Sequence, residues 1–182
     1  LVALDVDGTL TDGRLFIGPT GEAMKAFSVR DGFGLTLLRE AGVKLALITA
    51  RQSAIVEVRA AELRFDEVRQ GVKDKAAALG DLCARLGLTT QQAAYVGDDW
   101  PDLRAMALAG LAASVADAPA AVRERAHWVS RAPAGPVRCA SSPSSCCNRS
   151  SNSTRRWTVT RARHGDAAHL RPPRGRAVGR AA

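Results

Sequence analysis

Short aliphatic segments alternate with helical patterns along residues 1–130, and this alternation constrains the fold more than any other feature of the sequence. Strands that alternate with helices are typical of βαβ units, which build a mainly parallel sheet covered by helices on both faces. We therefore predict an α/β protein with a three-layer α/β/α, Rossmann-like fold. The predicted strands span 1–6, 43–48, 65–69, 93–96, 111–115 and 127–129, and the predicted helices span 32–41, 53–63, 74–86 and 101–109, with a short one from 119.

The segment between the first strand and the first helix predicts a small β-hairpin flap. Two short stretches within residues 14–28 flank the sequence Gly18-Pro19-Thr20-Gly21. Gly and Pro in such a cluster favour a tight turn between two strands. Because the first strand is already under way at Leu1, which is not a methionine, we also expect further residues before it.

The net charge of +8 belongs to the C-terminal segment alone. Residues 131–182 contain eleven arginines and one acidic residue, whereas residues 1–130 contain 15 basic and 17 acidic residues. The C-terminal segment is also rich in Ser and Pro, so it cannot bury enough apolar surface to offset the entropy lost on ordering. We predict one folded domain over 1–130 and a disordered Arg/Ser/Pro-rich tail over 131–182.

The basic tail has a second interpretation, as an arm that binds nucleic acid through phosphate contacts. Its single aromatic residue, Trp157, and the absence of repeated RG or RS pairs argue against nucleic acid as a partner.

The sequence favours a cytoplasmic protein without a membrane partner. No apolar stretch approaches the ~20 residues that cross a bilayer. The N-terminus also lacks the basic and then apolar pattern of a signal peptide. The four cysteines form no CxxC pair, so we expect neither a structural disulfide nor a zinc site.

Acidic pairs follow two of the predicted strands. Asp5 and Asp7 lie where the first strand ends, and the alternation of side chains along a strand predicts that both emerge on the same side. Asp98 and Asp99 follow the strand 93–96. The carboxyl ends of parallel strands meet at one sheet edge, and carboxylates so close together repel one another unless a cation lies between them. We therefore predict a Mg²⁺ site at this edge.

Two further groups at the same edge suit phosphoryl transfer. Thr49 ends the strand 43–48 with a hydroxyl, and Lys75 lies in the first turn of the helix 74–86 with a cation. Such groups bind phosphoryl oxygens and offset the negative charge that develops during transfer. Acid pairs alone are common on solvated loops, but four polar groups at consecutive positions of this kind favour a phosphoryl-transfer site.

This pattern resembles the haloacid dehalogenase (HAD) superfamily. The resemblance rests on DVDGT at 5–9, Thr49, Lys75 and GDD at 97–99, and it covers roughly residues 1–130. It implies a HAD-like fold and a Mg²⁺-dependent phosphatase, which is a phosphomonoester hydrolase. The chain has room for the flap and the helices named above and for no cap domain, so the resemblance is to the capless subclass.

The resemblance implies a role for each of these residues. Asp5 would be the nucleophile that forms an aspartyl-phosphate, and Asp7 would protonate the leaving oxygen and then activate water. Asp5, the backbone carbonyl of Asp7, and Asp98 would bind Mg²⁺, with Asp99 in support. The threonine and the lysine named above would be catalytic groups that bind the phosphoryl oxygens.

Longer strings, at 5–34, 48–51, 70–75 and 94–103, resemble capless phosphatases that act on phosphorylated sugar acids. This resemblance implies an eight-carbon sugar-acid phosphate as substrate and a homotetramer, with another nonulosonic acid phosphate as the alternative substrate. A substrate that carries both a carboxylate and a phosphate requires several cations. The implied substrate-binding residues are Asp7, Ser28, Val29, Arg30, Asp31, Gly32, Arg51, Arg59 and Lys75.

Two of these residues have a simpler interpretation. Arg30 and Arg59 lie in predicted helices or at their starts, where solvated charges are common. Ser28 and Ala50 also depart from the Asn and Gly that are frequent at these positions in the family.

The sequence after Gly135 departs from the family, which continues with a Gly-Arg-Gly segment and an amphipathic helix. Residues 135–141 can be encoded as GGC CCG GTG CGG TGC GCG AGC. One G inserted after the first C of the proline codon changes the translation to GRGAVRE. We therefore expect that a single-base deletion generated residues 136–182 and that the altered tail weakens assembly of a tetramer.

Overall fold

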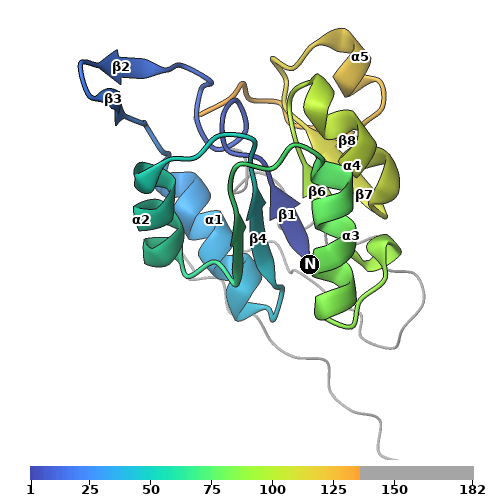
Figure 1. Ribbon diagram of the computed structural model, residues 1–182. Helices are drawn as coiled ribbons and strands as arrows, with labels where there is room; N and C mark the ends of the chain where they lie inside the picture. Colours follow the sequence, from blue (N-terminus) through green and yellow to red (C-terminus); the bar gives the residue numbers. More distant parts are fainter. Residues whose placement is uncertain (136–182) are drawn as a thin grey trace, which may run out of the picture. The chain divides into compact units, whose positions relative to one another are not determined.

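The computed structural model describes residues 1–135, and within them the six predicted strands form one parallel sheet (Figure 1). The strand order is β5-β4-β1-β6-β7-β8, and each neighbouring pair is parallel. The chain adds strands on one side of β1 and then on the other, so the order reverses beside β1. Ligands of such sheets bind at this reversal, beyond the carboxyl ends of the strands. The strands are β1 (Val2–Leu4), β4 (Leu45–Ile48), β5 (Glu67–Arg69), β6 (Ala94–Val96), β7 (Leu111–Ser114) and β8 (Trp128–Val129).

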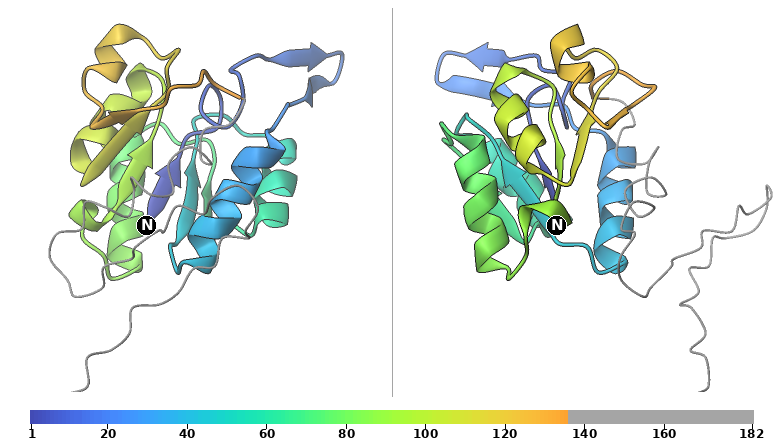
Figure 2. Two further views of the ribbon diagram at one scale, coloured as in Figure 1. Left: turned by 180° about the vertical axis from the view of Figure 1, so that it is seen from behind. Right: turned by 90° about the vertical axis from the view of Figure 1, so that its right-hand side faces the viewer.

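Helices cover both faces of the sheet, which confirms the predicted α/β architecture (Figure 2). Val2 and Leu4 of β1 pack with α1 (Val29–Glu40) and α2 (Ala54–Leu63) in one buried cluster. Ala3, between them, packs into a second cluster with α3 (Lys75–Arg85), α4 (Leu103–Leu108) and α5 (Ala120–Arg123). Successive side chains of a strand point to opposite faces, so one strand supplies both hydrophobic layers.

Polar side chains fix where the longer helices begin. Ser28, Ser53 and Asp74 occupy the N-cap positions of α1, α2 and α3, and each accepts a hydrogen bond from a backbone amide of the first turn. The helix predicted from Gly32 therefore begins at Val29, because the Ser28 hydroxyl accepts from the Asp31 amide at 3.3 Å.

The helix predicted over 101–109 consists of two pieces. A 3₁₀ turn, η2 (Trp100–Asp102), precedes α4, and another, η1 (Thr90–Gln92), precedes β6. Pro101 has no amide hydrogen, which suits it to the first turn of a helix.

The predicted flap is present as an antiparallel hairpin of β2 (Phe16–Gly18) and β3 (Gly21–Met24). Gly21 in the turn has φ +114°, a conformation that glycine adopts without a steric penalty. The hairpin projects beyond the carboxyl ends of the strands on the side of α1 and α2 (Figure 1).

The predicted tail lies almost wholly in residues 136–182, outside the described part of the chain. The domain boundary, the disorder and the shifted reading frame therefore stay predictions. Within residues 1–135, no helix combines the length and the apolar character that crossing a membrane requires.

Candidate active site

Asp5 lies directly after β1, at the carboxyl edge of the sheet. β1 ends at Leu4, but the Asp5 amide donates to the Val96 carbonyl of β6 at 2.9 Å, which ties Asp5 to the sheet. The Asp5 side chain is buried, and its Oδ1 lies 2.9 Å from Nζ of Lys75, the first residue of α3. The predicted nucleophile and the predicted cation are therefore in contact.

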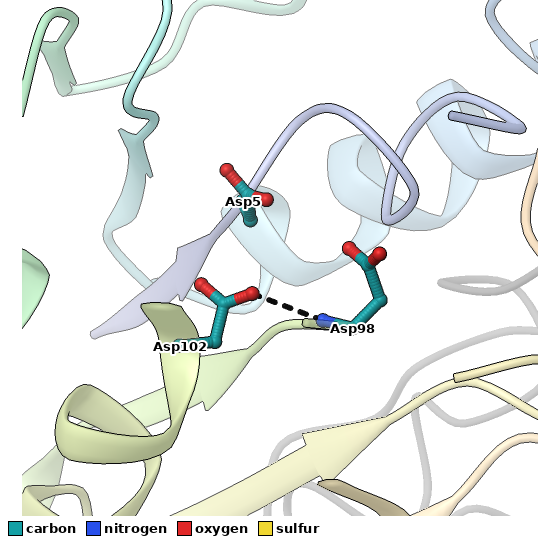
Figure 3. A group of neighbouring side chains, drawn as sticks. All are labelled: Asp5, Asp98 and Asp102. Atoms are coloured by element: carbon teal, nitrogen blue, oxygen red, sulfur yellow. Dashed lines mark hydrogen bonds between the residues drawn. The ribbon is translucent and has the colours of Figure 1, made fainter. Parts of the chain in front are cut away.

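Three carboxylates meet at this edge. One oxygen from each of Asp5, Asp98 and Asp102 lies within 4.8 Å of the other two. Figure 3 shows the three side chains converging from the end of β1 and from the segment that follows β6. The Thr9 hydroxyl fixes Asp98 by donating to its Oδ1 at 2.7 Å. Gly8 lies so close to Asp98 that a Cβ there would come within 2.0 Å of Oδ2.

Burial and mutual repulsion perturb these carboxyl groups. Burial and, to a lesser extent, the charge of Asp102 raise the pKa of Asp5 to about 6, against the opposing effect of Lys75. Burial also raises the pKa of Asp98 to about 7, with a further contribution from the neighbouring acids. A divalent cation bound between these carboxyl groups favours their ionised form, and Mg²⁺ prefers oxygen ligands. The residues present therefore fit a Mg²⁺ ion.

Asp102 connects the parts of the site, and the sequence did not predict it. Its side chain is fully buried, and Oδ1 accepts hydrogen bonds from Lys75 Nζ and from the Tyr95 hydroxyl, each at 2.7 Å. Oδ2 accepts from the backbone amide of Asp98 at 3.1 Å (Figure 3) and from that of Asp99 at 3.1 Å. Asp102 therefore anchors both the lysine and the segment that carries the other acids.

Lys75 is a buried cation between two acids. Burial alone would lower the pKa of Lys75, but the charges of Asp5 and Asp102 outweigh it and raise the pKa. Burial and the charge of Asp102 also raise the pKa of Tyr95, so its hydroxyl remains a neutral donor. Lys75 therefore stays positively charged beside Oδ1 of Asp5.

Thr49 lies at the same sheet edge, directly after β4, the strand that neighbours β1. It is buried, its amide donates to the Arg69 carbonyl at 2.9 Å, and its carbonyl accepts from the Val72 amide at 3.0 Å. The backbone therefore fixes Thr49 where a hydroxyl was predicted. Its action on phosphoryl oxygens stays a prediction.

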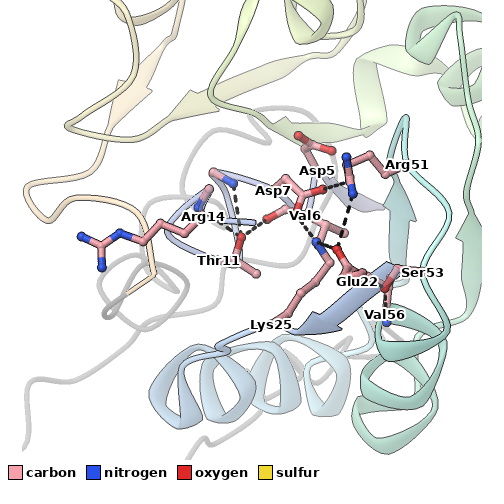
Figure 4. A network of polar contacts seen from close by, with 12 residues as sticks. Asp5, Val6, Asp7, Thr11, Arg14, Glu22, Lys25, Arg51, Ser53 and Val56 are labelled. Atoms are coloured by element: carbon pink, nitrogen blue, oxygen red, sulfur yellow. Dashed lines mark hydrogen bonds and ion pairs between the residues drawn. The ribbon is translucent and has the colours of Figure 1, made fainter. Parts of the chain in front are cut away.

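Asp7 faces a different set of partners from Asp5. The strand-alternation argument does not apply to these two residues, because β1 ends before both of them. Oδ1 of Asp7 contacts Nζ of Lys25, and Oδ2 lies 3.7 Å from Nε of Arg51 (Figure 4). Lys25 also pairs with Glu22 of the hairpin at 2.9 Å. Neither Lys25 nor Glu22 was predicted from the sequence.

The remaining predicted substrate-binding residues lie around the start of α1. Within this group, Val29 and Arg30 are exposed, whereas Asp31 and Gly32 are buried. Arg59 of α2 donates to the Ser28 carbonyl at 3.3 Å, pairs with Glu62 at 2.8 Å and lies over the Phe27 ring, 5.7 Å from its centroid. The interpretation of Arg59 as a solvated charge is therefore wrong, whereas Arg30 retains both interpretations.

The structure thus brings most of the predicted residues together in three groups. One group, Asp5, Lys75 and Asp98, is in mutual proximity. A second joins Asp7 to Arg51, and a third joins the start of α1 to Arg59. Asp99 is exposed, and its carboxylate accepts from the Trp100 amide at 2.8 Å at the start of η2.

Comparison with known proteins identifies the family of the chain. The family model of haloacid dehalogenase-like hydrolases matches residues 28–110, and curated relatives are 41% identical to the chain over 135 residues. The chain belongs to this family of hydrolases. Those relatives are the 3-deoxy-D-manno-octulosonate 8-phosphate phosphatases KdsC of Yersinia pestis and Escherichia coli K12, and the matches cover 74% of this chain and 72% of each relative.

Solved structures of phosphatases are also similar to the chain. The 3-deoxy-D-manno-octulosonate 8-phosphate phosphatase of Moraxella catarrhalis, in complex with a magnesium ion, a phosphate ion and KDO, superposes with a TM-score of 0.72 at 41% identity, over 74% of this chain and 77% of that one. The cobalt-bound deoxy-D-mannose-octulosonate 8-phosphate phosphatase of Haemophilus influenzae superposes with a TM-score of 0.72 at 41% identity, over 74% and 78%.

Proposed function

We propose that this chain is a Mg²⁺-dependent phosphatase that hydrolyses 3-deoxy-D-manno-octulosonate 8-phosphate through an aspartyl-phosphate on Asp5. The observation that carries the proposal is the contact of buried Asp5 with Lys75, 2.9 Å away, inside a cluster of three carboxylates. A carboxylate that a lysine orients beside a cation site can act as a nucleophile towards phosphorus.

The first half of the reaction transfers the phosphoryl group to the enzyme. A carboxylate oxygen of Asp5 attacks phosphorus, and the bond between phosphorus and the ester oxygen breaks. Asp7 donates a proton to that oxygen, which leaves as the sugar alcohol. Lys75 and Thr49 stabilise the negative charge on the phosphoryl oxygens during transfer.

The second half regenerates the enzyme. Asp7, now deprotonated, accepts a proton from a water molecule, and the resulting hydroxide attacks phosphorus. The acyl phosphate bond breaks, Asp5 returns to a carboxylate, and inorganic phosphate leaves. Asp7 ends protonated as it began, so the cycle is balanced for protons and oxygen atoms.

The metal would be held by Asp5, Asp98 and the backbone carbonyl of Asp7, with Asp99 supporting the segment. When bound, Mg²⁺ supplies positive charge that brings the anionic substrate up to a buried carboxylate and offsets the charge of the transferring group. Asp102 is not proposed as a ligand, because the lysine, the tyrosine and two amides already occupy its oxygens.

The substrate assignment rests on cations near the site and on the relatives. Arg51 lies 3.7 Å from the Asp7 carboxylate and is 43% exposed, so it can reach an anionic ligand in solution. Arg30, exposed in the first turn of α1, adds a second cation for a sugar carboxylate, and Arg59 fixes that end of α1. A nonulosonic acid phosphate, which has nine carbons, would meet the same charges, so it remains the alternative substrate.

Phosphate release from a panel of sugar phosphates tests the proposal. The panel contains the eight-carbon and nine-carbon sugar-acid phosphates and neutral sugar phosphates, each with Mg²⁺ or with EDTA, and Asp5→Asn serves as the blank. The proposal expects Mg²⁺-dependent release that is greatest for the eight-carbon acid. Release that persists in Asp5→Asn, or that is indifferent to the sugar carboxylate, would contradict it.

We further propose that the chain acts as a cytoplasmic homotetramer. The hairpin and the start of α1 expose large apolar side chains, of which Ile17 is 64%, Met24 58%, Val29 83% and Phe33 63% exposed. Exposed apolar residues concentrated in this way favour burial against another protein surface, here a second copy of the chain. Sedimentation velocity tests the proposal, and a monomer at micromolar concentration would contradict it.

A further inference from the structure

Lys25 is a cation enclosed by acids just after the hairpin flap. Its side chain is 1% exposed, and Nζ contacts Asp7 Oδ1 on one side and Glu22 Oε1, at 2.9 Å, on the other (Figure 4). A lysine is almost never buried unless it is paired. Because its ammonium group bridges these two carboxylates, the position of Asp7 depends on the hairpin.

Glu22 is in turn fixed to the body of the domain. Its Oε2 accepts a hydrogen bond from the Ser53 hydroxyl at the start of α2, and its Oε1 lies 3.7 Å from Arg51. The Ser53 amide donates to the Gln70 side chain at 2.7 Å. A continuous set of polar contacts therefore connects the first turn of α2, through Glu22 and Lys25, to the carboxylate of Asp7.

The Asp7 side chain is more exposed than that of Asp5, at 19% against 8%. Asp7 follows the strand in a turn. Its Oδ1 contacts Lys25, whereas Oδ2 has Arg51 only at 3.7 Å. Lys25 is thus the closest cation that orients the Asp7 carboxylate.

We propose that Lys25, held by Glu22, is a positioning residue that orients Asp7 for proton transfer to the leaving oxygen. The inference rests on the proposed phosphatase function, in which Asp7 is the general acid. Misplacement of a reacting group by about 1 Å can cost ~100-fold in rate. The hairpin is therefore part of the catalytic apparatus through the ion pair that it carries.

The test compares two esters that differ in their need for an acid. Departure of an alkyl oxygen from 3-deoxy-D-manno-octulosonate 8-phosphate requires a proton, whereas the p-nitrophenolate of p-nitrophenyl phosphate leaves without one. The parameter kcat/KM reports the steps up to departure of the leaving group, before the aspartyl-phosphate is hydrolysed. Lys25→Met should lower kcat/KM ~100-fold for the sugar ester and less than ~5-fold for the aryl ester.

Two further variants separate positioning from loss of an ion pair. Glu22→Gln keeps Lys25 but loosens it, so it should show the same dependence on leaving group with a smaller loss, about 10-fold for the sugar ester. Lys44→Met is the matched control, because Lys44 forms a lysine–aspartate pair with Asp66 at 2.6 Å, before the opposite end of β4. It should retain the wild-type kcat/KM for both esters.

Each outcome decides the inference. An equal loss for both esters in Lys25→Met and Glu22→Gln, or no loss for either, would overturn the positioning role. If Lys25→Met does not fold, the ratio in Glu22→Gln decides alone. Wild-type protein that hydrolyses neither ester would overturn the proposed function and the inference with it, whereas an active wild type with equal losses in the variants would overturn the inference alone.

Discussion

Asp102 offers the sharpest prediction about what holds the site together. Its replacement by alanine removes the acceptor of Lys75 and of the Tyr95 hydroxyl, each at 2.7 Å, and of two backbone amides at 3.1 Å. Asp102 is fully buried, as are its contacts with Lys75 and Tyr95, so water cannot replace these two contacts. Breaking a buried ion pair on one side costs 3–5 kcal/mol, so we expect Asp102→Ala to lower the free energy of unfolding by about 4 kcal/mol.

The assay is urea unfolding of the metal-free protein, followed by circular dichroism, with two companion variants. Asp102→Asn keeps the shape and one acceptor oxygen, so it should lose about half as much. Asp81→Ala removes an exposed aspartate of α3 and should stay within about 0.5 kcal/mol of the wild type. If Asp102→Ala does not accumulate as folded protein, Asp102→Asn supplies the measurement.

A loss in Asp102→Ala no greater than that of Asp81→Ala would refute the reasoning. It would mean that Lys75 and Tyr95 find other partners at no cost. Asp102 would then be an incidental neighbour of the site rather than its anchor.

Three further predictions concern the metal, the turn and the tail. Burial raises the pKa of Asp5 to about 6 and of Asp98 to about 7, so the metal-free fold retains protons that the unfolded chain loses, and its stability falls as the pH rises from about 4 through 7. Mg²⁺ should therefore raise the unfolding temperature relative to EDTA more at about pH 7.5 than at about pH 5.5, and an equal rise at both would contradict this. Gly8→Ala should abolish the Mg²⁺-induced rise in unfolding temperature, because its Cβ would lie 2.0 Å from Asp98 Oδ2. Gly42→Ala is the control: Gly42 has φ +83°, close to the +84° of Gly8, but no atom lies within 4 Å of the added Cβ, so this variant should keep the rise. A normal rise in both variants would count against the metal site. The DNA around codon 136 should lack one base relative to a reading frame that encodes GRGAVRE after residue 134. The same reading frame in independent DNA reads, together with an intact protein mass that matches the Arg-rich tail, would contradict that prediction.

The sequence predicts this fold and part of its site because both depend on local pattern. Alternating short strands and helices require a parallel sheet, and residues at the carboxyl ends of parallel strands share one edge. Asp5 follows β1 directly, Asp98 follows β6 after Gly97, and Lys75 begins α3. Their proximity therefore follows from the order of elements alone.

The rest of the site depends on contacts that sequence spacing does not encode. Asp102 contacts Lys75 from the end of the 3₁₀ turn η2, and a predicted continuous helix over this segment conceals that geometry. Lys25 and Glu22 resemble ordinary surface charges of a hairpin, but their side chains are only 1% and 12% exposed, and Lys25 pairs with both Glu22 and Asp7. One local signal could have drawn attention to Asp102: it is an acid that lies three residues after Asp99 and directly after Pro101.

The most direct test of the account is to isolate the phosphorylated enzyme. The protein is mixed with 3-deoxy-D-manno-octulosonate 8-phosphate and Mg²⁺, quenched in acid within a turnover, digested and measured by mass spectrometry. The account predicts an increase of about 80 Da on the peptide that contains Asp5, removed by hydroxylamine and absent from Asp5→Asn. Steady turnover with no such adduct at any time, or the adduct on a different residue, would contradict it.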